Sequence, residues 1–362
     1  MTDSRRICRL VAQASSTPSR PLAVSSQNPE ATVESKRIQW IDACKLISIA
    51  AVILGHTYSI GKPIHALTYS FHIPLFFVLA GYTFRAKPWR ALVGTSLRRL
   101  GVPYVALVVM ALVTGVTRGW VSSWAQLGSQ FLAALFAAGG TVVPFGIPAI
   151  GIAWFLACLL MTRLLLNAVV RLTGEREALG LVVCCACAVV GRQLGTRLFL
   201  PLALDQSLVA LLFMYVGWLV RRRSLVKALG RPVPLVLLAL VWLVPVRLGV
   251  FFSIGNLYFT RFVPGLVMTL AGSLFIMAAS ARAEAGPVGR LLAPLAALGR
   301  DSLALLVIHQ FELSLIDWGP VVERFGALAG AGAGVLHLLV VGSLYAALRT
   351  ASGRVASRSG RG

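Results

Sequence analysis

Lys45, His56 and His72 are the side chains best suited to chemistry, because each falls within or close to a long apolar run. Ionisable groups are costly in apolar surroundings, so those that occur there commonly serve a function. Eleven residues separate Lys45 from His56. On a helix this spacing returns to within roughly 20° of the same face, about 16 Å further along the axis. One narrow stripe therefore carries a cation at one depth and an acid–base group at another.

His72 lies about five residues into the second predicted helix and is expected at a depth similar to that of His56. The two histidines could face one pocket, where a histidine can act as a general acid or base near neutral pH. The alternative is structural, with each ring hydrogen-bonded to a neighbouring helix. Lys45 also has an alternative role, because Asp42 lies three residues earlier and can form an ion pair that neutralises both charges.

Later apolar runs contain a possible second polar cluster, formed by Arg163, Asp205, His309 and Glu312. His309 and Glu312 are three residues apart and can interact on one helix face. The favoured interpretation is that these two side chains pair with each other as part of the helix packing. A second proton relay is the alternative. Arg163 requires a partner, and either Asp205 or Glu312 could supply it.

The composition identifies the elements that must position these side chains. Apolar residues make up 57% of the 362 positions and charged residues only 13%, far from the balance of a soluble domain. A bilayer core about 30 Å thick requires roughly 20 apolar residues per helix. We expect an all-α polytopic integral membrane protein with about ten transmembrane helices, near residues 40–58, 67–84, 100–117, 151–170, 178–191, 205–220, 233–250, 262–281, 302–316 and 327–348.

The net charge of +22 would ordinarily point to nucleic-acid binding. With the N-terminus in the cytoplasm, however, most of the 34 Lys and Arg residues fall in the two tails and in the connections on that same side. This asymmetry follows the positive-inside rule, with both termini cytoplasmic. No nucleic-acid partner is expected. No metal site is expected either, since the spacing of the three clustered cysteines, at 184, 185 and 187, matches no zinc pattern.

The chain divides into three predicted parts. Residues 1–37 form a disordered basic cytoplasmic tail, residues 38–350 the transmembrane domain, and residues 351–362 a basic cytoplasmic C-terminal tail. Within the domain, residues 118–150 are predicted to form an interfacial helix and a loop on the outer side. Glycines at 326, 330 and 334 recur every four residues, which indicates close helix packing.

Two segments, WIDACKLISIAAVILGH (Trp40–His56) and SFHIPLFFVLAGYTFR (Ser70–Arg85), resemble the opening of the membrane acyltransferase 3 family, especially its fucose 4-O-acetylase-like members. The family's first helix carries a basic residue, ten further residues and a histidine. Lys45 and His56 match this motif, and Asp42 matches the family's preceding aspartate. The resemblance continues in order through RRLGVPY, AWFLACLL, LPLALDQSLVALLFMYVGWLV and LGRDSLALLVIHQ. The first tail and residues 118–150 match nothing in the family, which leaves the acceptor open.

The resemblance implies transfer of an acyl group, most often acetyl from acetyl-CoA, to a hydroxyl of a sugar, glycan or metabolite in a cell membrane. No permanently bound cofactor is implied. His56 would be the general base, with His72 and Asp42 as the other catalytic residues. Four cations on the inner side, Lys45, Arg85, Arg98 and Arg99, could meet the phosphates of coenzyme A, although for each of the three arginines the role of a positive-inside anchor is favoured. A cell-envelope polysaccharide is the expected acceptor.

A secondary transporter of a small polar or anionic solute is the alternative, because many carriers also combine about ten helices with scattered intramembrane charge. Carriers built from inverted repeats show matching halves. The second half of this sequence contains no copy of the Lys45–His56 stripe or of FHIPLFF. The sequence therefore favours an enzyme.

Overall fold

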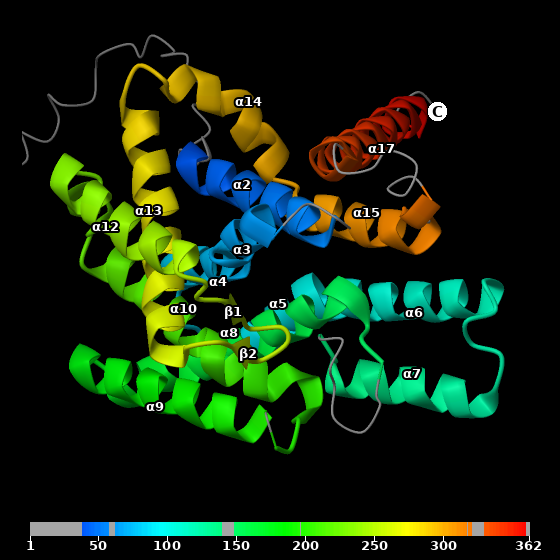
Figure 1. Ribbon diagram of the computed structural model, residues 1–362, viewed down its shortest axis with the longest axis horizontal. Helices are drawn as coiled ribbons and strands as arrows, with labels where there is room; N and C mark the ends of the chain where they lie inside the picture. The colour runs from blue at the N-terminus through cyan, green and yellow to red at the C-terminus, as the bar shows by residue number, and fades with distance from the viewer. Residues whose placement is uncertain are drawn as a thin grey trace, which may run out of the picture. The chain divides into compact units, whose positions relative to one another are not determined.

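The computed structural model describes residues 38–57, 62–139, 148–195, 197–316, 318–320 and 329–359. The predicted N-terminal tail, Gly326 and the last three residues of the predicted C-terminal tail lie outside these ranges. Of the described residues, 81% are helical. Its one described sheet is a small antiparallel hairpin in which β1 (Phe252–Ser253) pairs with β2 (Tyr258–Phe259) (Figure 1).

Every predicted transmembrane segment coincides with helix in the structure. In chain order these helices are α2 (Gln39–His56), α3 (Lys62–Tyr69) with α4 (His72–Tyr82), α6 (Val102–Thr117), α8 (Trp154–Thr173), α9 (Glu177–Gly195), α10 (Leu204–Arg222), α12 (Pro232–Arg247), α13 (Phe262–Ala285), α15 (Ser302–Leu315) and α17 (Ala329–Ser359). The remaining elements are α5 (Trp89–Ser96), the π-helix η1 (Leu97–Gly101), α7 (Trp124–Phe136), the 3₁₀ turns η3 (Gly151–Ala153) and η4 (Pro201–Ala203), α11 (Val226–Leu229) and α14 (Gly289–Gly299).

Seven helical segments among the described residues are long and apolar enough to cross a membrane: 62–82, 89–117, 151–173, 177–195, 201–222, 262–285 and 332–351. Helices α12 and α15 are apolar but shorter. Helix α2 has 18 residues and carries Asp42, Lys45 and His56. The protein is therefore an all-α membrane protein.

Apolar side chains on the outside of the helices agree with this conclusion. Val102 and Val105 of α6, and Val233 and Leu237 of α12, are each more than half exposed. Contiguous apolar surface of this kind is unfavourable in water but is what a lipid-facing helix presents.

The structure corrects several predicted boundaries. The second segment is interrupted at Ser70–Phe71, so His72 is the first residue of α4 and not a residue inside a longer helix. Pro74 accounts for the break, because it has no N–H to donate to the Ser70 carbonyl four residues earlier. Trp242 Nε1–H donates to Ser70 Oγ (2.7 Å) and supports the interruption from α12. At the C-terminus, α17 continues as helix through the predicted boundary at residue 351.

The predicted interfacial helix within residues 118–150 corresponds to α7. A capping box begins it, in which the Ser123 side chain accepts from the Gln126 backbone N–H and the Gln126 side chain accepts from the Ser123 backbone N–H. Trp124 is 88% exposed at its start. Residues 140–147, which belong to the predicted loop, lie outside the described residues.

Helix α10 is the most deeply buried helix and packs against α4, α8 and α9 (Figure 1). Two glycines make its crossing with α4 close. A Cβ added at Gly81 of α4 would lie 1.8 Å from the Met214 carbonyl oxygen, and one at Gly217 of α10 would lie 1.9 Å from the Val78 carbonyl oxygen. Backbone therefore meets backbone, which holds α4 and its leading residue, His72, in a defined position.

We expect Gly217→Ala to destabilise the protein, because the added methyl group would force α4 and α10 apart. Overpacking of this kind costs about 1–3 kcal/mol. The matched control is Gly94→Ala in α5, where no atom lies within 4 Å of the added Cβ and alanine favours the helix by about 0.5–1 kcal/mol. Thermal unfolding in detergent measures both. A Gly217→Ala protein as stable as the control would contradict the close crossing.

Candidate active site

His56 and His72 line the same cavity, which has a volume of about 60 Å³. The cavity is small and can take only a few non-hydrogen atoms. His56 ends α2 and is exposed, whereas His72 begins α4 and is 2% exposed. The other lining residues come from α2 to α4, from the α7–η3 connection, from η3 and α8, from the β-hairpin and from α15: Val52, Tyr69, Ile73, Pro74, Phe76, Gly139, Ile152, Trp154, Phe155, Phe252, Ser253, Ile254, Gly255, Asn256 and Leu306.

Backbone hydrogen bonds determine which nitrogen of each ring is available. The Nδ1 atom of His56 lies 2.7 Å from the Val52 carbonyl oxygen, and that of His72 lies 2.6 Å from the Thr68 carbonyl oxygen. A carbonyl oxygen can only accept, so Nδ1 carries the proton in both rings. In each neutral imidazole, Nε2 then holds the free lone pair, which is the form that a general base requires.

Tyr69 links the two histidines through ring contacts. Its ring centroid lies 6.3 Å from that of His56 and 4.9 Å from that of His72. His65 stacks on Tyr69 at 4.1 Å and on Phe251 at 5.7 Å. The sequence-based prediction missed His65 because it precedes the predicted second helix, although its four-residue spacing from Tyr69 could have indicated a shared helix face.

The β-hairpin supplies part of the cavity wall, and the sequence did not predict this. Its Ser253, Gly255 and Asn256 line the cavity beside Trp154. A Cβ added at Gly255 would lie 2.7 Å from the Trp154 ring, and one at Gly139 would lie 2.6 Å from the same ring. The indole is therefore held between two glycines. The polar Ser-Ile-Gly-Asn stretch between two apolar helices was the available signal.

Lys45 lines a second cavity, of about 210 Å³, together with Arg163, Thr83 and Ser302. The possible ion pair is formed, since Lys45 Nζ lies 2.9 Å from Asp42 Oδ1, with the lysine side chain 28% exposed and the aspartate 4% exposed. Phe76, Phe155 and Leu306 line both cavities and so form a common wall. Leu156 and Leu159 of α8 add apolar lining to the second cavity.

Arg163 does not have the partner that was predicted. Its guanidinium lies over the Phe84 ring, 5.9 Å from the centroid. Asp205 instead accepts from the backbone N–H groups of Leu200 (3.2 Å) and Gln206 (2.9 Å) at the start of α10. Glu312 has other partners, which are described below. The four residues of the predicted second cluster therefore lie in three separate places in the fold.

The three arginines proposed to meet phosphate groups are exposed, and none of them lines either cavity. Arg85 follows α4, while Arg98 and Arg99 belong to η1. Their exposure is compatible both with anchoring at the membrane surface and with contact to a ligand that extends out of the Lys45 cavity.

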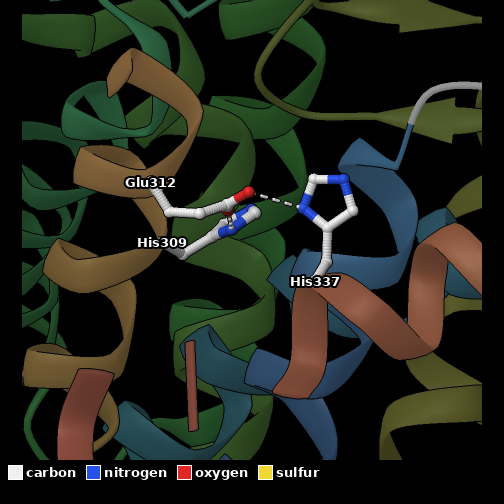
Figure 2. Close-up of side chains that lie close together, drawn as sticks. All are labelled: His309, Glu312 and His337. Atoms are coloured by element: carbon white, nitrogen blue, oxygen red, sulfur yellow. Dashed lines mark hydrogen bonds and ion pairs between the residues drawn. The ribbon is translucent and has the colours of Figure 1, made fainter. Parts of the chain in front are cut away.

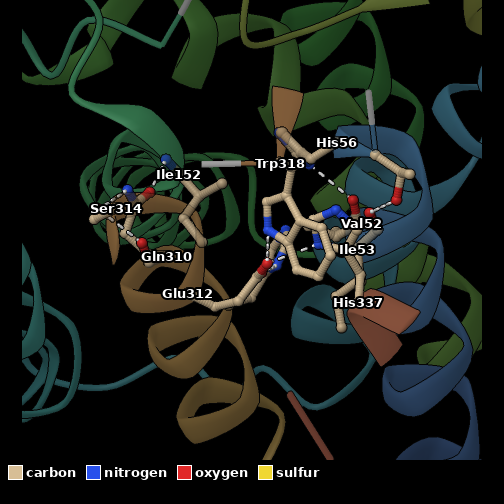
Figure 3. Close-up of polar contacts among 11 residues, drawn as sticks. Val52, Ile53, His56, Ile152, Gln310, Glu312, Ser314, Trp318 and His337 are labelled. Carbon is tan, nitrogen blue, oxygen red and sulfur yellow. Dashed lines mark hydrogen bonds and ion pairs between the residues drawn. The ribbon is translucent and has the colours of Figure 1, made fainter. Parts of the chain in front are cut away.

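His309 and Glu312 of α15 form a buried cluster with His337 of α17 (Figure 2). His309 Nδ1–H donates to Glu312 Oε2 (3.0 Å), and His337 Nδ1 lies 2.8 Å from Glu312 Oε1 without the angle of a hydrogen bond. Trp318 Nε1–H also donates to this carboxylate (Figure 3). The ligand atoms of the three residues in Figure 2 lie within 4.8 Å of one another. Two histidines and a glutamate are a ligand set that zinc accepts, which the sequence-based prediction of no metal site did not consider.

The cluster contacts the first cavity through His56. The ring centroids of His309 and His56 are 5.7 Å apart, with an interplanar angle of 67°. From the same helix, Gln310 Oε1 accepts from the backbone N–H of Ile152 (2.8 Å), which ties η3 to α15 beside the cavity (Figure 3). The sequence predicted the His309–Glu312 contact but not the approach of either residue to His56.

We expect diethyl pyrocarbonate, which reacts with an unprotonated imidazole nitrogen, to modify His56 first, because His56 is exposed and its Nε2 is free. His65, which is partly buried, should follow. His72, His309 and His337 are 2%, 0% and 1% exposed and should react only after unfolding. Peptide mass spectrometry of the folded and the denatured protein gives the order. Modification of His337 ahead of His56 would contradict the geometry.

Comparison with known proteins agrees with the site and the fold. A family model described as an acyltransferase domain, acyltransferase 3, matches residues 38–341. Neither a search of curated proteins nor one of solved structures found a match. The match covers most of the chain, including both cavities and the buried cluster. This chain, with its apolar helices and its paired histidines, therefore belongs to the acyltransferase 3 family. It is a membrane acyltransferase that transfers groups other than amino-acyl groups.

Proposed function

We propose that the protein transfers an acyl group, acetyl in the simplest case, from acyl-CoA to a hydroxyl of a sugar, glycan or metabolite, with His56 as the general base. One observation carries this proposal. Two cavities lie at the two ends of the α2 stripe, one with Lys45 and Arg163 and the other with His56 and His72, and they share the wall formed by Phe76, Phe155 and Leu306. A cation site and a base are thus adjacent but at different depths.

Coenzyme A combines a phosphate-bearing head with a long thin arm that ends in the thioester, and the paired cavities suit that shape. The cations Lys45 and Arg163 would hold a phosphate or the polar end of the arm in the larger cavity. The arm would pass the Phe76–Phe155–Leu306 wall to bring the thioester carbon to His56. In a topology of ten spans with both termini in the cytoplasm, the Lys45 end faces the compartment that contains acetyl-CoA.

The chemical step follows from the free lone pair on His56 Nε2. The acceptor O–H gives its proton to this nitrogen while the oxygen attacks the thioester carbon, the C–S bond breaks, and the thiolate takes the proton from His56. The products are an ester and the thiol of coenzyme A. His72, whose Nε2 is also free, would orient the acceptor hydroxyl.

The acceptor would enter from the side of the β-hairpin and η3. Aromatic rings of Tyr69, Trp154 and Phe252, together with Ser253 and Asn256, give that side the mixed apolar and polar lining typical of small-molecule sites. The exposed Asn256 side chain is our proposed donor to the oxyanion that develops on the thioester. A polysaccharide of the cell envelope, in the cell membrane, is the acceptor that we propose.

We expect His56→Ala to lower acyl transfer by at least about 100-fold, because a general base typically contributes 10²–10⁴-fold. The measurement is incorporation of label from acetyl-CoA by membranes that contain equal amounts of wild-type or variant protein, followed by identification of the labelled product. Undiminished labelling by His56→Ala would remove His56 from the mechanism. No labelling by the wild type with any acyl-CoA would exclude the proposed function.

We expect Lys45→Met to raise the apparent KM for acetyl-CoA about tenfold, through loss of a charged hydrogen bond. Lys227→Met, at an exposed lysine of α11, is the matched control and should leave KM unchanged. The double variant Asp42→Asn with Lys45→Met separates the two roles of the lysine. It removes both charges of the ion pair, so a KM that returns to the wild-type value would show that Lys45 only neutralises Asp42.

A further inference from the structure

Glu312 is a buried carboxylate without a permanent cation. It is 1% exposed, and its partners among the described residues are His309, His337 and Trp318, of which none carries a fixed positive charge. Burial of an unpaired charge is costly, so buried carboxylates are normally paired with a cation. The Glu312 carboxylate is therefore a buried negative charge that a positive charge close by would stabilise.

His309 connects this negative charge to the proposed base. Its Nδ1–H donates to Glu312 Oε2, so its Nε2 holds a lone pair, and this atom is buried with no hydrogen-bond partner among the described residues. The His309 ring is also the one that approaches His56, with 5.7 Å between centroids. A carboxylate, an imidazole and a second imidazole are thus arranged in series.

The other carboxylates of the described transmembrane domain are engaged away from His56. Asp42 pairs with Lys45, Asp205 accepts from backbone N–H groups, and Asp301 accepts from Tyr345. Glu177 pairs with Arg222 and Arg223, and Glu175 also pairs with Arg222. Glu284 accepts from the backbone N–H of Gln39. Among the described residues, Glu312 is therefore the carboxylate whose bonded partner touches the His56 ring.

We propose that the Glu312–His309 pair is the counter-charge of His56 during acyl transfer, an inference that rests on the proposed function. When His56 Nε2 takes the acceptor proton, the imidazolium and the Glu312 carboxylate together become electrically neutral. His309, which contacts both, transmits the interaction and keeps its own Nδ1 proton. The proton then leaves His56 for the thiolate of coenzyme A, and Glu312 remains ionised throughout. Both residues of the pair are positioning residues, since neither lines the cavity.

A divalent metal ion bound by His309, Glu312 and His337 would have the opposite effect. A net positive charge beside His56 would oppose formation of the imidazolium. The same three side chains would thus present a negative charge to His56 without a metal ion and a positive charge with one, and experiment can separate the two cases.

The test compares Glu312→Gln, Glu312→Asp and Asp205→Asn in the acetyl-CoA labelling assay, with equal protein abundance. We expect Glu312→Gln to lower the maximal rate about 100-fold, to leave the apparent KM for acetyl-CoA within about twofold, and to increase the solvent deuterium isotope effect, because proton transfer becomes rate-limiting. Glu312→Asp, which keeps the charge, should recover a large part of the rate. Asp205→Asn, the control for loss of a buried carboxylate, should leave the isotope effect unchanged even if the protein is less stable.

Three results would overturn the inference. The first is a wild-type maximal rate in Glu312→Gln. The second is a loss of rate with an unchanged isotope effect and no rescue by Glu312→Asp, which would make Glu312 structural. The third is one equivalent of zinc in the purified wild type that is lost from His337→Gln, which would assign the three residues to a metal site. Absence of activity in the wild type itself would instead count against the proposed function.

Discussion

A charged side chain inside a bilayer must find its partners within the protein, because lipid offers no hydrogen bonds and little screening. The arrangement of this protein depends on that constraint. Asp42 and His72 are buried within the domain, and Lys45 and His56 line its two cavities, while α6 and α12 present valine and leucine outward. The polar groups are thereby concentrated along one stripe of α2 and the surfaces that face it.

Close packing at small residues makes this enclosure possible. Gly81 and Gly217 let α4 and α10 meet backbone to backbone, and the interruption at Ser70–Phe71 lets His72 start a helix at the cavity instead of lying within one. The break leaves backbone groups without helical partners. Ser70 Oγ–H donates to the Leu67 carbonyl and so satisfies part of that need, while Ser70 Oγ accepts from the Trp242 indole. A polar contact from α12 thus stabilises the break that precedes His72.

The two cavities give the site a direction across the membrane. A larger cavity with two cations and a smaller one with two histidines share a thin apolar wall, so a ligand that reaches from one to the other must be narrow at that wall. Cations at one depth and bases at another suit a donor with a charged head and a reactive end far from it. The buried Glu312 is bonded to His309, whose ring contacts that of His56, and it lines neither cavity.

The sequence by itself determined the class of the protein, the helical segments, the Lys45–His56 stripe and the family, because apolar run length, helical periodicity and a spaced motif are local properties of the chain. It also predicted the Asp42–Lys45 and His309–Glu312 contacts, since pairs three residues apart must be neighbours on a helix. Only the tertiary structure decided which distant segments meet. Three features depend on how separate elements pack: the β-hairpin beside Trp154, the place of Arg163 over Phe84 instead of beside Asp205 or Glu312, and the approach of His337 to Glu312 and of His309 to His56. Periodicity along one helix carries no information about the rotation and depth of its neighbours, and those are set by side-chain packing between elements far apart in the chain.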